Sequence, residues 1–342
     1  MVATPVVGSV GSVTHRPPLD PAVAAVRLAV RQGLGSVPDG ASVIVGLSGG
    51  ADSLALTAAA VFEASRRAIE VVAVTVDHGL QDGSADAADA ARRAASALGA
   101  AARVTRVEVD GTGGPEAAAR DARYRALRDA ARAEGAAAVL TGHTLDDQAE
   151  TVLLGLARGS GAASLQGMAA ASDLDGVPLL RPLLGVRRET TRAACLALGL
   201  TPWDDPHNAD PRFTRVRVRE RVLPVMEAEL GPGIAEALAR TAEQLREDAA
   251  AFEEMIDETI EDIVEHAEAG IAVSVAALAA NPPALRHRII RHVVAAEFGE
   301  SLTRAQTLEV ARLVTAWSGQ GPIDLPACRA ARVGGRVVFT AR

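Results

Sequence analysis

The sequence predicts an α/β protein with a doubly wound parallel sheet, followed by a second, mostly helical domain that ends in a β-hairpin. Short buried strands alternate with longer helices in the first part, which is the pattern of βαβ units. Past Pro224 the pattern becomes helical, and Gly334-Gly335 between two apolar runs is typical of a hairpin turn. At about 150 residues per domain, a chain of 342 residues suits two domains.

The elements follow from apolar runs and from the residues that bound them. Pro115 and Gly135 bound one helix, because proline is favoured in the first turn and glycine just past the end. Strands are expected at 42–47, 71–76, 103–109, 137–141 and 178–184, and helices from the loop after the first strand to Arg67, at 84–98, at 115–134 and from Leu145. Later helices are expected at 233–268, 284–298 and 303–317. We divide the chain into a disordered tail over 1–20, an α/β domain over 21–220 and a helical domain over 221–342.

The chain contains no lysine, so all 35 of its basic residues are arginines. A Schiff-base lysine and a lysine-containing P-loop are therefore excluded. Phosphate chemistry must use Arg, backbone N–H groups, helix N-termini or a metal ion. The two cysteines, Cys195 and Cys328, are far apart in sequence, which argues against a cysteine-ligated metal site and fits a cytoplasmic protein. No apolar run reaches the roughly 18 residues of a membrane span.

The formal net charge of −8 is unevenly distributed. Ten acids and no Arg lie between Glu247 and Glu268, whereas five Arg and one Glu lie between Arg212 and Arg221. We interpret the acidic run as a solvated helix surface. Alternation of Arg215, Arg217 and Arg219 suits contacts with a nucleic-acid backbone.

The first motif is a loop of six residues, Ser48-Gly49-Gly50-Ala51-Asp52-Ser53, between a buried strand and a helix. Two glycines let the backbone approach an anion, and the helix start offers free N–H groups and the positive dipole end. The two serines add hydroxyl donors. A carboxylate repels phosphate, so Asp52 makes sense if it binds Mg²⁺ or if it faces another part of the site. A simpler alternative is a Gly-rich turn with a Ser or Asp cap.

The second motif, His143-x-x-Asp146-Asp147-x-x-Glu150, follows the predicted strand at 137–141. Open α/β sheets bind ligands at this end of their strands. On a helix the three carboxylates can point the same way, which is unfavourable unless a cation such as Mg²⁺ or a substrate ammonium joins them. The alternative is a capped first helical turn, where acids are stabilising.

Two further features leave alternatives open. Arg120 and Arg123 share a helix turn with Glu116 and Tyr124, which fits either a surface salt-bridge ladder or a phosphate or RNA site. His78 ends the second strand, where it would either line a nucleotide pocket or make a structural hydrogen bond.

In combination these motifs resemble the tRNA(Ile)-lysidine synthetases, of the PP-loop ATP pyrophosphatase superfamily. The resemblance covers about residues 40–225. Besides the two motifs above, it rests on Val76-Asp77-His78-Gly79-Leu80, Glu116-x-x-x-Arg120-x-x-Arg123-Tyr124, Gln148-x-Glu150-Thr151 with Arg158-Gly159-Ser160-Gly161, Arg181-Pro182-Leu183-Leu184, Trp203-x-x-Asp205-Pro206-x-Asn208-x-Asp210 and the Arg-rich stretch to Leu223-Pro224. The chain is similar to the shorter members that lack an extra C-terminal domain, and it departs from the family at Val216, where Asn is frequent.

The resemblance implies an adenine nucleotide alpha hydrolase-like PP-loop fold and an ATP-dependent ligase of tRNA modification. Such an enzyme adenylates O2 of the wobble cytidine in tRNA(Ile) with a CAU anticodon; the amine of L-lysine then attacks C2, which gives lysidine, AMP and pyrophosphate. The expected partners are this tRNA and lysine, with a homodimer left open and no membrane.

The resemblance also implies roles for the candidate residues. ATP is bound by Ser48, Gly49, Gly50, Ala51, Asp52, Ser53 and His78, with Mg²⁺ expected. Asp52, His143, Asp147 and Glu150 are the candidate catalytic residues, because a carboxylate must hold the ammonium and accept its proton. The substrates are expected to contact Arg120, Arg123, Asp146, Arg215, Arg217 and Arg219.

Two rival functions stay open at this point. A tRNA 2-thiocytidine enzyme would share the ATP step but needs clustered cysteines, which Cys195 and Cys328 do not supply. A non-catalytic nucleotide-binding module would need neither the carboxylates at 146–150 nor the Arg-rich stretch.

Overall fold

The computed structural model describes residues 19–79, 83–109, 114–159, 161–205, 209–267 and 270–342. These residues form two compact units, which divide between Ala242 and Glu243. Most of the tail predicted over 1–20 lies outside the described residues, although the Asp20 side chain caps the first helix. The functional domains predicted over 21–220 and 221–342 stay predictions.

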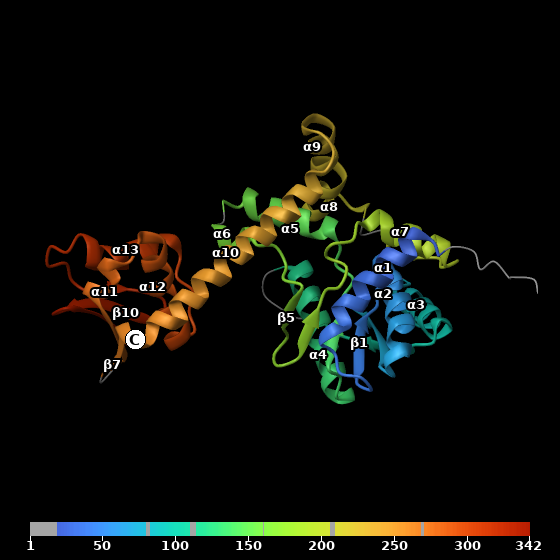
Figure 1. Ribbon diagram of the computed structural model, residues 1–342, viewed down its shortest axis with the longest axis horizontal. Coiled ribbons are helices and arrows are strands. Elements are labelled where there is room, and N and C mark those ends of the chain that lie inside the picture. The colour runs from blue at the N-terminus through green and yellow to red at the C-terminus, as the bar shows by residue number, and fades with distance from the viewer. Residues whose placement is uncertain (1–18, 80–82, 110–113, 160, 206–208, 268–269) are drawn as a thin grey trace, which may run out of the picture. The chain divides into compact units, whose positions relative to one another are not determined.

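The first unit is built on a six-stranded sheet in the order β3-β2-β1-β4-β6-β5 (Figure 1). All of its neighbouring strands pair in parallel except β5, which runs antiparallel to β6 at the edge. The strands are β1 (Ser42–Gly46), β2 (Glu70–Asp77), β3 (Ala101–Arg106), β4 (Ala138–Leu140), β5 (Ala171–Asp173) and β6 (Pro178–Leu180).

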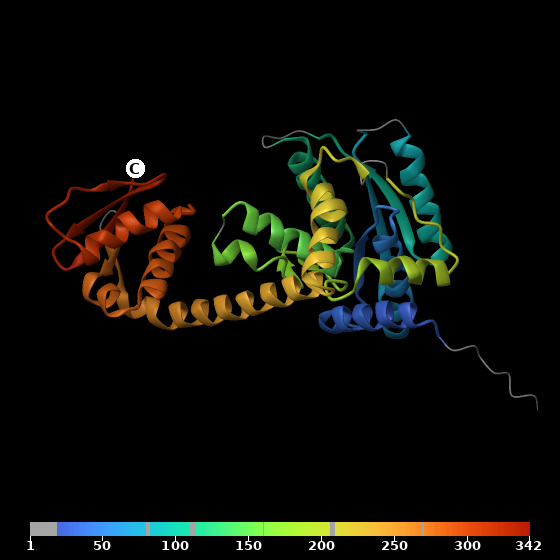
Figure 2. The same cartoon turned by 90° about the horizontal axis from the view of Figure 1, so that it is seen from above.

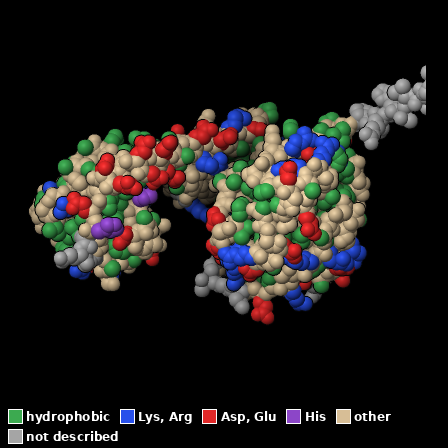
Figure 3. Space-filling view, turned by 60° about the horizontal axis from the view of Figure 1, so that its bottom comes forward, with side chains coloured by type: hydrophobic (Ala, Val, Ile, Leu, Met, Phe, Trp, Pro, Cys, Tyr) green, Lys and Arg blue, Asp and Glu red, His purple; other side chains and the backbone are tan. Residues whose placement is uncertain are grey.

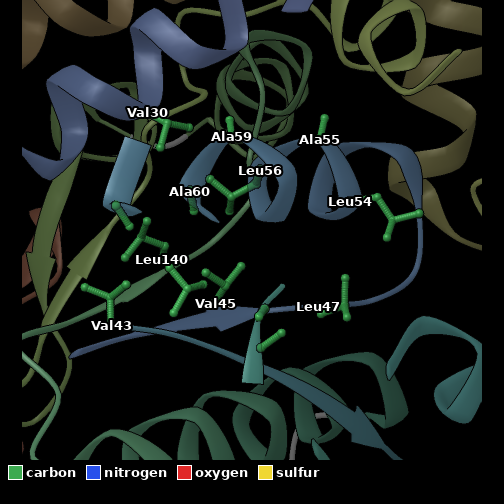
Figure 4. Close-up of a cluster of buried hydrophobic side chains, with 14 of the residues drawn as sticks. Val30, Val43, Val45, Leu47, Leu54, Ala55, Leu56, Ala59, Ala60 and Leu140 are labelled. Carbon is green, nitrogen blue, oxygen red and sulfur yellow. The ribbon is translucent and has the colours of Figure 1, made fainter. Parts of the chain in front are cut away.

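Apolar residues of the central strands face both sides of the sheet, so each face carries its own core. On one face Val43 and Val45 of β1 pack against Leu56 and Ala60 of helix α2 (Figure 4). On the other face Ile44 packs with α4 in a separate cluster. Burial on both faces is what a parallel sheet covered by helices requires, and it confirms the predicted doubly wound α/β class.

The helices and single helical turns of the first unit follow the order that βαβ connections impose. They are α1 (Pro21–Gly33), η1 (Leu34–Ser36), α2 (Ala51–Ala64), η2 (Ser65–Arg67), α3 (Ser84–Leu98), α4 (Pro115–Glu134), α5 (Leu145–Ala157), α6 (Ala162–Leu165), α7 (Arg188–Ala197), α8 (Thr214–Arg217), the π-helical turn η4 (Val218–Val222) and α9 (Leu223–Leu230). Sequence patterns predict α2 to α5 closely, but they do not predict α1 or α7.

Helix α10 (Ile234–Ile263) starts in the first unit and ends in the second. The helix predicted to reach residue 268 ends earlier, because the chain continues as strand β7 (Val264–Ala267). Its acidic side chains, among them Glu253, Glu254 and Glu258, are exposed to solvent, and Figure 3 shows acidic side chains gathered along this helix.

The second unit packs helices on a five-stranded antiparallel sheet in the order β7-β8-β11-β10-β9 (Figure 2). The predicted terminal hairpin is confirmed as the pair β10 and β11, and it belongs to this larger sheet. The remaining elements are β8 (Gly270–Ser274), α11 (Val275–Ala280), α12 (Pro283–Phe298), α13 (Arg304–Thr315), β9 (Ile323–Asp324), β10 (Cys328–Val333) and β11 (Arg336–Ala341). In the described chain, we find no helix with both the length and the apolar character of a membrane span.

Candidate active site

Two polar segments leave the carboxyl ends of neighbouring parallel strands. The loop Ser48–Ser53 follows β1, and the segment from Thr141 into α5 follows β4, which pairs directly with β1. Gly142 lies so close to the loop that a Cβ there would be 3.0 Å from the backbone carbon and oxygen of Asp52. The absence of a side chain at Gly142 therefore allows the two segments to meet.

The loop holds itself in place through its two serines. The Ser53 hydroxyl donates to the carbonyl of Gly50 at 3.0 Å, and it accepts the backbone N–H of Ser48 at 3.1 Å. The two serine hydroxyls are also 3.1 Å apart. Helix α2 begins at Ala51, and the N-cap residue Gly50 has no side chain to cap the first turn, so the N–H groups of that turn are available to an anion.

Asp52 lies in the first turn of α2 and faces helix α7. One of its carboxylate oxygens accepts the hydroxyl of Thr191, and the other lies 3.6 Å from Nε of Arg188. Burial raises the pKa of Asp52, and the hydrogen bond from Thr191 opposes that rise. No cluster of three or more His, Cys, Asp or Glu ready to bind a metal occurs in the described ranges.

The carboxylates of α5 are engaged by the protein itself. Asp147 closes a capping box, because its Oδ2 accepts both the backbone N–H of Thr144 at 2.8 Å and its hydroxyl at 2.9 Å. Asp146 instead accepts the backbone N–H of Arg188 at 2.7 Å and lies 3.3 Å from Arg187. Two of the three acids, Asp147 and Asp146, therefore cap helices, as the alternative of a capped helical turn predicts. Accepting these hydrogen bonds leaves both carboxylates negatively charged.

Glu150 is fully buried, and three arginines surround it. Arg219 binds it with two N–H groups at 2.8 and 3.1 Å, and Arg188 donates to Oε1 at 3.1 Å. Arg215 lies 3.8 Å from Oε2 and also donates to the hydroxyl of Thr151. The structure thus brings Arg215 and Arg219 to the predicted carboxylates, from a segment more than 60 residues later in the chain.

Arg188 is a member of this cluster that sequence analysis does not predict. Its guanidinium donates to Asp147 at 2.8 Å as well as to Glu150, and it reaches Asp52 of the loop. Burial opposes its charge, but Asp147, Glu150 and Asp52 outweigh that effect and raise its pKa. One signal was present in the sequence: the pair Arg187-Arg188 follows a predicted strand of the same sheet, so it belongs at the same edge.

His143 stands between the carboxylates and a group of cations. Its Nδ1 is 3.0 Å from the hydroxyl of Thr141. Burial lowers the pKa of His143 to about 4, although the charge of Asp147 opposes the shift. The imidazole is therefore neutral at pH 7 and serves as a hydrogen-bonding group rather than a cation.

Arg120 and Arg123 bring two positive charges to Tyr124, and the charge of Arg123 acts on His78. The guanidinium carbons of Arg120 and Arg123 lie 5.1 and 5.6 Å from the ring centre of Tyr124. Burial lowers the pKa of Arg123, and the charges of Arg120 and Arg215 add to the shift. Burial and the charge of Arg123 lower the pKa of His78, whose buried Nδ1 has no hydrogen-bond partner in the described part of the chain. Excess positive charge and an unsatisfied nitrogen are features of a site for an anionic ligand.

Arg217 does not join the carboxylates, because its guanidinium donates to the carbonyls of Pro211 and Arg212 and to the hydroxyl of Thr214. The side chain of Glu116, and residues Leu80, Ser160, Pro206 and Asn208 of the family motifs, lie outside the described part of the structure.

Comparison with known proteins is decisive at this point. The model of the PP-loop domain matches residues 26–226, and that of the TilS substrate binding domain matches residues 274–338. A tRNA(Ile)-lysidine synthase of Leifsonia xyli is 60% identical over 302 residues, which cover 88% of this chain and 90% of that protein. The chain belongs to the tRNA(Ile)-lysidine synthase family. A synthase of Salinispora tropica is 53% identical, over 90% of this chain and 93% of that protein.

A solved structure of another protein has a fold similar to that of this chain. The U34-tRNA thiolase NcsA of Methanococcus maripaludis, which carries a [4Fe-4S] cluster, matches with a TM-score of 0.57. The match covers 66% of this chain and 79% of that one at 21% sequence identity, so it shows the fold alone. In our chain both cysteines are free and buried, Cys195 in the first unit and Cys328 in the second.

Membership of the synthase family makes the chain an ATP-using ligase of tRNA modification. The PP-loop match spans every candidate site residue described above, from Ser48 to Arg219. The match to the substrate binding domain lies wholly within the second unit.

Proposed function

We propose that the protein joins L-lysine to C2 of the wobble cytidine in tRNA(Ile) with a CAU anticodon, through an adenylated cytidine, and releases AMP and pyrophosphate. One observation carries the proposal: Arg188 links the phosphate loop, through Asp52, to the carboxylates Asp147 and Glu150. A ligase of this kind needs a site for the leaving pyrophosphate next to a site for an amine, and the loop and the carboxylates that we propose for these roles lie at one edge of the sheet.

The loop suits the adenylation step. Negative charge develops on the pyrophosphate as it leaves, and the N–H groups at the start of α2 are positioned for such charge. Arg120 and Arg123 add positive charge with no carboxylate partner among the described residues, which supports a role in binding phosphates of ATP or of the tRNA. His78 offers its unpartnered Nδ1 to the nucleotide.

Asp52 fits a Mg²⁺ ion shared with ATP. Mg²⁺ in phosphoryl sites is bound by one or two carboxylates together with substrate phosphates, and the ion neutralises phosphate charge. The Asp52 oxygen that faces Arg188 accepts no hydrogen bond within the described residues. Asp52 is thus the residue that would hold the ion.

The carboxylates of α5 suit the amine step. The lysine amine has a pKa near 10.4 in water and must lose a proton before it attacks C2. Asp147 and Glu150 would bind the ammonium, and one carboxylate of the site would accept its proton. Burial, which would raise the pKa of Asp147, is outweighed by the charge of Arg188 and the hydrogen bonds from Thr144, so the pKa of Asp147 is lowered. It is therefore ionised and ready to hold a cation at pH 7.

We assign to neutral His143 the role of orienting the base by a hydrogen bond. The target base must leave its stack to reach this site. We assign contacts with the tRNA backbone to Arg217 and to the second unit, which matches the substrate binding domain. Arg217 is held by its own segment rather than by carboxylates, so its charge is available to a phosphate.

Incubation with labelled lysine, ATP and a transcript of tRNA(Ile) with a CAU anticodon tests the proposal. We expect ATP-dependent label in this tRNA, and none in elongator methionine tRNA, which has the same anticodon. Absence of label, with AMP formation that does not depend on tRNA, would contradict the proposed function.

A further inference from the structure

The predicted ammonium site is already filled by a cation of the chain itself. Arg188 donates from Nη2 to Oδ1 of Asp147 at 2.8 Å and from Nη1 to Oε1 of Glu150 at 3.1 Å. Its Nε lies 3.6 Å from Asp52, so the guanidinium occupies the space between the phosphate loop and helix α5. An amine that attacks a base adenylated at that loop has to enter the same space.

The carboxylate oxygens have little capacity left for a second cation. Oδ2 of Asp147 accepts two hydrogen bonds from Thr144, which fill its two lone pairs. Oε1 of Glu150 accepts from Arg188 and from Arg219. A substrate ammonium has three donors, so it can bind both carboxylates only where a guanidinium withdraws.

The balance of charges in the cluster also indicates that a substrate ammonium must replace a guanidinium. The three carboxylates Asp52, Asp147 and Glu150 are balanced by three guanidinium groups, those of Arg188, Arg215 and Arg219. An added ammonium would leave this buried group with excess positive charge, whereas exchange for one guanidinium keeps it neutral. Of these three guanidinium groups, only that of Arg188 also reaches Asp52, so Arg188 occupies the space that the amine has to enter and is the group to be exchanged.

We propose that Arg188 is a specificity-determining residue: in the lysine-free enzyme its guanidinium occupies the ammonium subsite between Asp52, Asp147 and Glu150, and lysine binds by displacing it. The inference rests on the proposed function. It predicts that Arg188 lowers the affinity for lysine and keeps the carboxylates paired until lysine arrives.

Steady-state kinetics of Arg188→Gln test the proposal, once the wild-type enzyme has been shown to incorporate lysine. We expect the KM for lysine to fall about tenfold and the KM for ATP to change less than twofold. Methylguanidinium should compete for the vacated subsite and return the KM for lysine toward the wild-type value. Arg192→Gln, the same change at an exposed position of α7, should leave both KM values unchanged.

An unchanged or raised KM for lysine in Arg188→Gln would overturn the proposal, because it would show that Arg188 is a fixed wall of the site. Arg188→Lys keeps the charge, so its KM for lysine should stay within threefold of the wild-type value; a tenfold fall there would also overturn it. Should the Gln variant not fold, a tenfold fall in the KM for lysine of the Lys variant would still overturn the proposal. Failure of the wild-type enzyme to incorporate lysine would instead contradict the proposed function itself.

Discussion

The phosphate loop and the carboxylate cluster lie at the ends of neighbouring strands, but they differ in how far apart in sequence their bonded residues are. The hydrogen bonds of the two loop serines join residues no more than five positions apart, and contacts from Thr191, Cys195 and Trp203 add to them. The cluster is distant: Glu150 is bound by arginines 38 and 69 positions away. The serine bonds of the loop depend on its own residues, whereas the carboxylate cluster depends on three segments packing together around buried charge.

The largest effect expected from this difference is that of Glu150→Gln. Removing one partner of a buried ion pair leaves the other charges uncompensated, which destabilises a protein by about 3–5 kcal/mol. We expect a loss of that size in the free energy of unfolding, measured by urea denaturation. Glu63→Gln is the matched control, because buried Glu63 pairs with a single, half-exposed arginine, Arg31, and should lose about 1 kcal/mol or less. Equal losses of unfolding free energy in Glu150→Gln and Glu63→Gln would show that the carboxylate cluster is no more sensitive than a single ion pair.

Gly142→Ala should displace the backbone of the phosphate loop, although Gly142 itself lies outside the loop. Its Cβ would be 3.0 Å from backbone atoms of Asp52, which cannot move aside as a flexible side chain can. Overpacking of this kind destabilises by about 1–3 kcal/mol. We expect tRNA-dependent ATP–pyrophosphate exchange to fall at least tenfold. Gly35→Ala, where a Cβ has open space, should leave exchange unchanged; normal exchange in Gly142→Ala would show that the approach is not needed.

The free energy of unfolding should depend on pH through His143, which follows strand β4 just before the carboxylates of α5. Its folded pKa of about 4 lies below the unfolded value near 6.5, so the unfolded state takes up the proton first as pH falls. Its contribution is therefore complete above pH 6.5 and is lost between pH 6.5 and 4. From pH 7 to 5 the loss is about 2 kcal/mol, at 1.36 kcal/mol per pH unit. Denaturation at both pH values should show a smaller loss in His143→Asn; an equal loss would assign the effect elsewhere.

The smallest effect is expected for Cys195→Ser beside the loop. The Cys195 thiol is 3.3 Å from the carbonyl of Ala51, and burial raises its pKa to about 11, so it is protonated at neutral pH. A serine hydroxyl can donate to the same carbonyl. We expect exchange within twofold of the wild type and a stability change of about 1 kcal/mol, the typical size of one hydrogen bond. A tenfold loss of ATP–pyrophosphate exchange would contradict this expectation and would show that the Cys195 thiol takes part in the chemistry.

The same contrast explains what the sequence could predict. The loop was found from six consecutive residues, and α3 matches its predicted range of 84–98, because local composition decides both. The position of Arg188 after a predicted strand indicates the edge of the sheet, but it does not indicate that helix α7 brings its guanidinium against Asp147 and Glu150. The sheet of the second unit was foreseen only as a hairpin, since the Gly334-Gly335 turn is local whereas the pairing of β8 with β11 joins residues more than 60 positions apart.

The central claim is that the loop performs adenylation and the carboxylate cluster performs lysine transfer. Asp147→Asn tests it most directly, because an Asn oxygen can still accept the hydrogen bonds from Thr144 while the charge is lost. Two rates are measured on the same tRNA(Ile): ATP–pyrophosphate exchange without lysine, and incorporation of labelled lysine. We expect ATP–pyrophosphate exchange within threefold of the wild-type rate and incorporation of lysine at least a hundredfold lower. Parallel loss of both activities, or full incorporation, would contradict it.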